Sequence, residues 1–199
     1  KNTGRALDSF FNRNEDKMLK VLRKEKEIDF LSGEITGYIV RIQRLPGLTK
    51  DDQSELFRMH ELRMDLERVG DHAENIAEYC GETLETESTF TPDALYELKA
   101  MSEKTMEALR ASIDALNTAD HEHKDLLIRQ CLVAEDDVDM MQTNIRENHI
   151  RRLNRGDCAP RAGMIFSDMA VDLERIADHA VNIADISREQ GDDSLFSPN

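Results

Sequence analysis

The sequence DLERVGDHAENIAEY spans Asp65–Tyr79 and returns as DLERIADHAVNIADI over Asp172–Ile186. Ten of the fifteen aligned positions are identical. A match of this length does not follow from composition alone, so the chain contains an internal duplication. We therefore expect two structural repeats of similar fold, each carrying one copy of this stretch.

The composition predicts an all-α protein. Aromatic residues make up 5% of the 199 residues and Trp is absent, whereas Leu, Ala, Met, Glu, Lys and Arg, which favour helices, are plentiful. No stretch alternates polar and apolar residues as a half-buried strand would. No run of about 18 apolar residues occurs, so no segment of this sequence is expected to span a membrane. The three cysteines are scattered, which indicates reduced thiols and neither a disulfide framework nor a zinc site.

The charge balance restricts the classes of partner. Asp and Glu number 41 against 26 Lys and Arg, which gives a formal net charge of −15. Nucleic acids and anionic lipid surfaces require a basic patch, so we expect no nucleic-acid partner. The acidic excess is compatible with cation binding, and solubility alone would also explain it.

Apolar residues at helical spacing, interrupted by Pro, Gly and capping residues, divide the chain into two groups of three helices. We predict repeat 1 at 1–81, a linker at 82–91, repeat 2 at 92–188 and a tail at 189–199. Asn12 is the expected N-cap of the second helix, and Thr49 with Asp52 forms a capping box for the third. The helix expected at 93–117 has a counterpart that would begin before Lys1, so we expect the first helix to be truncated and further sequence to lie upstream.

Apolar stripes on the second and third helices are expected to face the core of repeat 1. Their residues are Ile28, Leu31, Ile35, Tyr38, Ile39 and Ile42 on the second helix, and Met59, Leu62, Leu66, Val69, Ala73, Ile76 and Cys80 on the third.

Pairs of acids four residues apart recur at equivalent positions of both repeats. They are Glu25 with Asp29, Glu67 with Asp71, Glu135 with Asp139, and Glu174 with Asp178. Residues i and i+4 lie on one face of a helix, where two carboxylates repel each other unless a cation lies between them. Oxygen ligands of this kind suit Fe, Mn, Mg or Ca. Because the middle and last helices of a three-helix unit are antiparallel neighbours, each repeat can bring two pairs together.

A single pair of this kind carries no weight, because about eight would arise by chance in so acidic a chain. Recurrence in both repeats favours a metal site, although an ordinary solvated face has the same pattern. Arg68 and Arg175 are expected to form ion pairs with the neighbouring carboxylates. His72 and His179, which lie beside the apolar stripe, are expected to be partly buried and not to be metal ligands.

The duplicated stretch resembles the signature of the PhoU family, the bacterial phosphate-uptake regulators. The resemblance covers nearly the whole chain and implies a six-helix arrangement of two similar bundles. It also implies multinuclear metal clusters, of iron above all, with zinc, manganese or magnesium as alternatives. Glu25, Asp29, Glu67 and Asp71 would form one surface site, and Glu135, Asp139, Glu174 and Asp178 the other. Ala177 departs from the Gly of the first copy without removing a ligand.

The segments 24–31, 35–40 and 45–49 resemble the PhoU-like domain of bacterial sodium–phosphate cotransporters. The main prediction is therefore a metal-binding, non-enzymatic regulatory domain, located in the cytoplasm and controlling phosphate transport. Its partner would be the membrane domain of the cotransporter, and upstream segments would tether it to the inner membrane. The alternative is a free-standing regulator of the phosphate ABC transporter and its sensor kinase. A homo-oligomer is compatible with either function.

Two hypotheses from other classes remain. One is a metal-dependent oxidase or metal-storage protein built on a helical bundle, but no His has a Glu three residues before it, as the di-iron proteins of this kind require. The other is a helical interaction module whose acids only keep it soluble.

Overall fold

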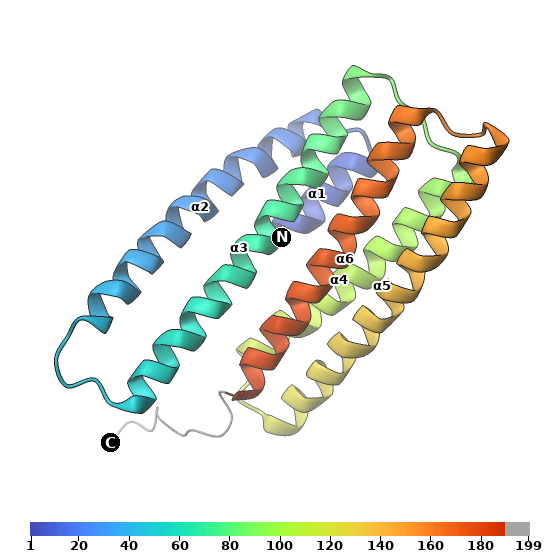
Figure 1. The fold of residues 1–199 in the computed structure, drawn as a ribbon. Helices are drawn as coiled ribbons and strands as arrows, with labels where there is room; N and C mark the ends of the chain where they lie inside the picture. Colours follow the sequence, from blue (N-terminus) through green and yellow to red (C-terminus); the bar gives the residue numbers. More distant parts are fainter. Residues whose placement is uncertain (190–199) are drawn as a thin grey trace.

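A computed structural model describes residues 1–189, and within this range the chain is all α-helical, with six helices and no strand (Figure 1). This confirms the predicted fold class. The helices are α1 (Asn2–Phe11), α2 (Glu15–Gln43), α3 (Lys50–Glu85), α4 (Pro92–Asn117), α5 (His121–Arg155) and α6 (Pro160–Glu189). The predicted tail lies outside the described residues, except for Glu189 at the end of α6.

The helix ends follow local capping chemistry. The capping box of Thr49 and Asp52 is present, as predicted. The N-cap of α2 is Asn14, whose side chain accepts a hydrogen bond from the backbone of Lys17. The predicted cap, Asn12, is wrong because its amide donates to Asp8 instead. Helix α3 continues past Gly81 to Glu85, because a single helical glycine costs only about 1 kcal/mol and does not end a packed helix.

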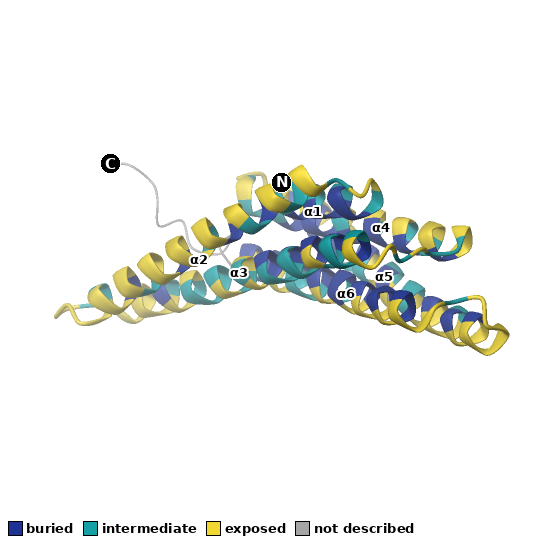
Figure 2. Cartoon of the chain, turned by 90° about the horizontal axis from the view of Figure 1, so that it is seen from above, coloured by how far each residue is buried: buried dark blue, intermediate teal, exposed yellow. Residues whose placement is uncertain are grey.

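The six helices form an elongated molecule that bends near its middle (Figure 2). Helices α4, α5 and α6 pack against one another as a three-helix bundle, and α2 and α3 form an antiparallel pair with α1 over one end. The two repeats meet mainly where α3 lies beside α6. This contact places the two copies of the duplicated stretch next to each other.

The hydrophobic core is distributed unevenly between the repeats. Its continuous cluster includes α4, α5, α6, α1 and the C-terminal half of α3, but only Val21 from α2. Between the far ends of α2 and α3 lies an apolar groove of about 640 Å³. Several residues predicted to face the core line this groove and are exposed, namely Leu31, Ile35, Tyr38, Met59 and Leu66. In repeat 2, the 26-residue α4 packs against both α5 and α6.

None of the helices within residues 1–189 combines the length and the apolar character that a bilayer-spanning helix requires.

Candidate metal centres

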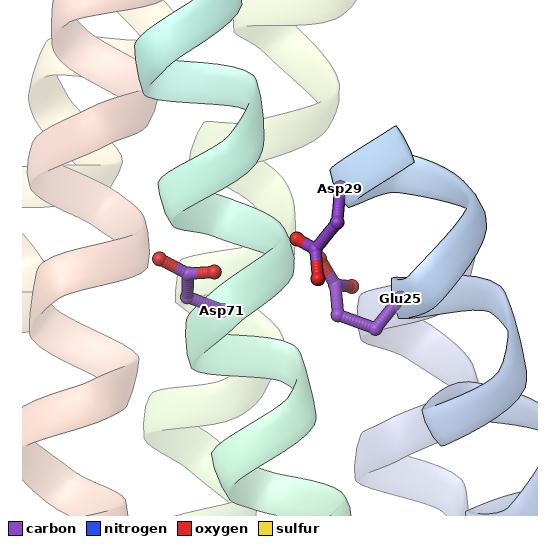
Figure 3. Close-up of side chains that lie close together, drawn as sticks. All are labelled: Glu25, Asp29 and Asp71. Carbon is purple, nitrogen blue, oxygen red and sulfur yellow. The ribbon is translucent and has the colours of Figure 1, made fainter. Parts of the chain in front are cut away.

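Three of the four acids predicted for repeat 1 meet between α2 and α3. Glu25 and Asp29 lie one turn apart on α2 and face α3, which carries Asp71 (Figure 3). One carboxylate oxygen of each lies within 4.8 Å of the others. We call this group site 1. Its donors are all carboxylate oxygens, the ligands that hard cations prefer.

Glu25 differs from an ordinary surface acid. Only 1% of the residue is exposed, and among the described residues neither of its carboxylate oxygens has a hydrogen-bond partner. Burial of an ionised carboxylate without a partner is unfavourable. The carboxylate fits there because position 70 is glycine, since a Cβ at Gly70 would lie 2.5 Å from its Oε1 atom. The expected surface location therefore does not hold for this residue.

The surroundings raise the pKa of Glu25 to about 7. Burial is the largest cause, and the neighbouring charges of Asp29, Asp71 and Glu74 add to it. The nearby Asn2 amide has the opposite effect and lowers the pKa of Glu25, but it is the smallest of these influences. The Asn2 nitrogen does not reach the Glu25 carboxylate in hydrogen-bond geometry. A bound cation would offset both the desolvation and the repulsion.

The equivalent acids of repeat 2 meet in the same way. Oxygens of Glu135 and Asp139 on α5 and of Asp178 on α6 lie within 4.8 Å of one another. We call this group site 2. Burial, followed by the charges of Asp139 and Asp178, raises the pKa of Glu135. Glu135 is only partly buried, however, and Ala177 stands where repeat 1 has Gly70.

The fourth predicted acid of repeat 1, Glu67, is not part of the three-oxygen group. Its carboxylate accepts from Arg63 at 2.8 Å. The residue equivalent to Arg63 in repeat 2 is Ala170, so Glu174 lacks this particular partner. Burial and then the charge of Asp178 raise the pKa of Glu174, which places this carboxylate near site 2 although outside its three-oxygen group.

Site 1 has a different additional acid, which the sequence analysis missed. Glu74 lies three residues after Asp71, and burial, with the charges of Glu78, Asp29 and Asp71, raises its pKa. Its equivalent in repeat 2 is Val181, so the requirement for recurrence in both repeats removed it from consideration. Helical spacing from Asp71 was the available signal.

The two arginines of the duplicated stretch form the expected ion pairs. Arg68 contacts Asp71 at 3.3 Å, and Arg175 contacts Asp178 at 3.2 Å and Glu174 at 3.5 Å. Both arginine side chains are more than half exposed, so each pair contributes little to stability. Each arginine donates to the Oδ2 atom of its aspartate.

The rest of the duplicated stretch joins the two repeats. Asp172 on α6 accepts from three residues of α3: His72 through Nδ1 at 2.6 Å, Tyr79 at 2.6 Å and Asn75 at 3.1 Å. Because an ionised carboxylate can only accept, the Nδ1 atom of His72 carries a proton.

The reciprocal contacts form in the other direction. Asp65 on α3 accepts from His179 at 2.9 Å and from Asn182 at 3.0 Å, and the two imidazole rings lie 5.7 Å apart. We call these contacts the cross-repeat network. Both histidines are partly buried, as predicted, and neither belongs to site 1 or site 2.

Comparison with known proteins agrees with this architecture. A model of the PhoU domain matches residues 1–80 and 98–187, which is most of the chain. The chain belongs to the PhoU domain family. The predicted resemblance to this family is thereby confirmed.

Relatives support the same assignment. The chain is 30% identical to phosphate-specific transport system accessory protein PhoU homolog 1 of Thermotoga maritima, over 90% of this chain and 75% of that protein. It is 28% identical to a PhoU homolog of Zymomonas mobilis, over 91% of this chain and 73% of the relative.

Solved PhoU structures have the same fold. The crystal structure of PhoU from Pseudomonas aeruginosa superposes with a TM-score of 0.83 at 19% identity, covering 94% of this chain and 86% of that one. The phosphate transport system regulatory protein PhoU from Streptococcus pneumoniae gives a TM-score of 0.77 at 17% identity, covering 99% and 89%.

Proposed function

We propose that this PhoU-family chain is a non-enzymatic regulator of phosphate transport whose two acidic centres bind hard metal cations. The observation that carries the metal-binding part is Glu25, a buried carboxylate without a hydrogen-bond partner among residues 1–189, directed into a group of acids. Such a group is unfavourable unless a cation compensates its charge. Iron is the principal candidate, and manganese, magnesium and zinc are the alternatives.

The regulatory part rests on the relatives. Those from Thermotoga maritima and Zymomonas mobilis are named accessory proteins of the phosphate-specific transport system. These names support a free-standing regulator of a phosphate transporter more than the cotransporter domain that the sequence favoured. We therefore propose the phosphate ABC transporter and its sensor kinase as partners. An oxidase is the weaker hypothesis, because the three-oxygen groups within residues 1–189 contain no histidine.

Elemental analysis of the purified, untagged protein tests metal binding. The double variant Asp71→Asn with Asp178→Asn should contain no bound transition metal. In a host whose own gene for this protein is replaced by the variant, phosphate uptake should no longer be controlled. The matched control is Asp51→Asn with Asp125→Asn, which makes the same charge change at exposed helical positions. Equal metal content in all three proteins would contradict the proposal, as would metal loss without any change in phosphate uptake.

A second experiment separates the two kinds of regulator. The chain is expressed as a separate polypeptide in that host. Restored control of uptake is expected for a free-standing regulator. Control that returns only when the chain is fused to a transporter membrane domain would overturn this assignment in favour of the cotransporter.

A further inference from the structure

We propose that the two centres are not equivalent, and that Gly70 makes site 1 the tighter cation site by allowing Glu25 to lie against the backbone of α3. This inference rests on the proposed function, since it concerns the same two groups of acids. It assigns to one glycine, which supplies no ligand atom, the control of affinity at the neighbouring centre.

The first step is steric. Around Gly70, a Cβ would lie 2.5 and 2.9 Å from the two carboxylate oxygens of Glu25 and 3.0 Å from its Cδ. Carbon atoms do not approach so closely, so an alanine at this position would displace the carboxylate. Because the displaced group is the end of a flexible side chain, it can move toward solvent without disturbing the helices. Alanine is also a better helix former than glycine, so folding is not the reason for the glycine.

The second step is desolvation. Without a cation, the Glu25 carboxylate is shielded from solvent and accepts no hydrogen bond from residues 1–189. Coordination by a cation provides the missing interaction without first removing a hydration shell. Glu74, whose equivalent is Val181, adds a further negative charge near site 1. Both features favour a cation at site 1.

Site 2 provides the internal reference. Ala177, at the position equivalent to Gly70, is fully buried and carries the Cβ that Gly70 lacks. Glu135 accordingly keeps partial exposure to solvent. A cation at site 2 must displace more water from this carboxylate, which lowers the net gain on binding.

The test uses Mn²⁺ alone as the probe, with free aqueous Mn²⁺ measured by electron paramagnetic resonance at pH 8. Glu135→Gln with Asp178→Asn leaves site 1 as the reporter, and Glu25→Gln with Asp71→Asn leaves site 2. Gly70→Ala is added to the first protein and Ala177→Gly to the second. The matched control is Gly33→Ala in the first protein, because a Cβ at Gly33 on α2 would meet nothing within 4 Å.

We expect site 1 to bind Mn²⁺ at least tenfold more tightly than site 2. Gly70→Ala should weaken site 1 by about tenfold, Gly33→Ala should leave it unchanged, and Ala177→Gly should tighten site 2. Circular dichroism checks that each variant is folded, and if Gly70→Ala does not fold, the Ala177→Gly result decides.

Three results would overturn the inference. Equal affinity at the two sites, or tighter binding at site 2, would overturn it and leave the proposed function intact. Unchanged affinity in a folded Gly70→Ala protein would do the same. Absence of Mn²⁺ binding at both sites would remove the proposed metal-binding function together with the inference.

Discussion

Repeat 1 and repeat 2 carry nearly the same duplicated stretch but place it in different surroundings. In repeat 2, α4 packs against both α5 and α6, whereas in repeat 1 an apolar groove lies between the ends of α2 and α3 that are remote from α1. At the acidic centres, Glu25 is fully buried over Gly70, and Glu135 stays partly exposed beside Ala177. The difference shows that the shared motif determines which acids lie close together. The residues around them determine how unfavourable that arrangement is without a cation.

The largest expected effect is a loss of stability when one acceptor of the cross-repeat network is removed. Asp172 accepts from three residues and Asp65 from two, so the two losses should differ. Asp172→Ala leaves His72, Asn75 and Tyr79 without their acceptor in a buried position, and should lower the free energy of unfolding by roughly 3–5 kcal/mol. Asp65→Ala affects two donors and should cost less. Urea denaturation of both variants measures the difference. A greater loss for Asp65→Ala would mean that the two halves have been ranked incorrectly.

The pH dependence of stability should separate the two centres. The pKa of Glu25 is raised from 4.5 to about 7 in the folded protein, so its contribution favours folding at low pH and is lost as the pH rises through about 7. With chelator present, Glu25→Gln should therefore gain about 2–3 kcal/mol over the wild type between pH 5 and pH 8.

The comparison is made by urea denaturation at both pH values. Glu34→Gln, an exposed acid on the same helix, should show no such gain. Glu135→Gln should show a smaller one, because Glu135 is less buried than Glu25. If the difference in stability between the wild type and Glu25→Gln were the same at both pH values, burial would not raise the pKa of Glu25 as described.

Because one of two equivalent isoleucines lines the groove and the other is buried, their truncation should lower the free energy of unfolding by different amounts. Ile145 on α5 is 4% exposed, and its equivalent on α2, Ile35, is 46% exposed. Ile145→Ala should cost about 2–4 kcal/mol, as truncation of a buried isoleucine does, and Ile35→Ala less than about 1 kcal/mol. Thermal unfolding of the two variants provides the measurement. Equal costs would show that the far end of α2 is covered in solution.

The smallest effect concerns the exchange of glycine and alanine. Ala177→Gly introduces a glycine into a helix and removes a buried methyl group, so it should lower stability by about 1 kcal/mol. At pH 5, where burial of Glu25 costs least, Gly70→Ala should raise the stability of the metal-free protein by a similar amount, because it replaces a helical glycine with a better helix former. Differential scanning calorimetry would show whether the two changes have opposite signs.

The duplicated stretch and the apolar spacing were enough to predict an all-α fold and the six helices. Six of the eight predicted ligands also lie in the two three-oxygen groups. The sequence analysis paired Glu67 with Asp71 and overlooked Arg63, although Arg63 lies four residues before Glu67 on the same helix. The requirement for recurrence excluded Glu74, whose equivalent is Val181, although its spacing from Asp71 places both on one helix face. The burial of Glu25 depends on the approach of α2 to Gly70, a contact between helices that no local pattern encodes.

The cross-repeat network also restricts how the two halves of this chain can change over generations. Asp65 serves His179 and Asn182, and Asp172 serves His72 and Asn75, so each copy of the stretch supplies the acceptor that the other copy needs. A substitution of either aspartate therefore removes a hydrogen-bond acceptor from residues of the other repeat. Only a second, compensating substitution in that repeat would restore the contact. The three positions that make these reciprocal contacts are among the ten that are identical in the two copies, whereas Gly70 and Glu74, which lie outside the network, differ between the copies.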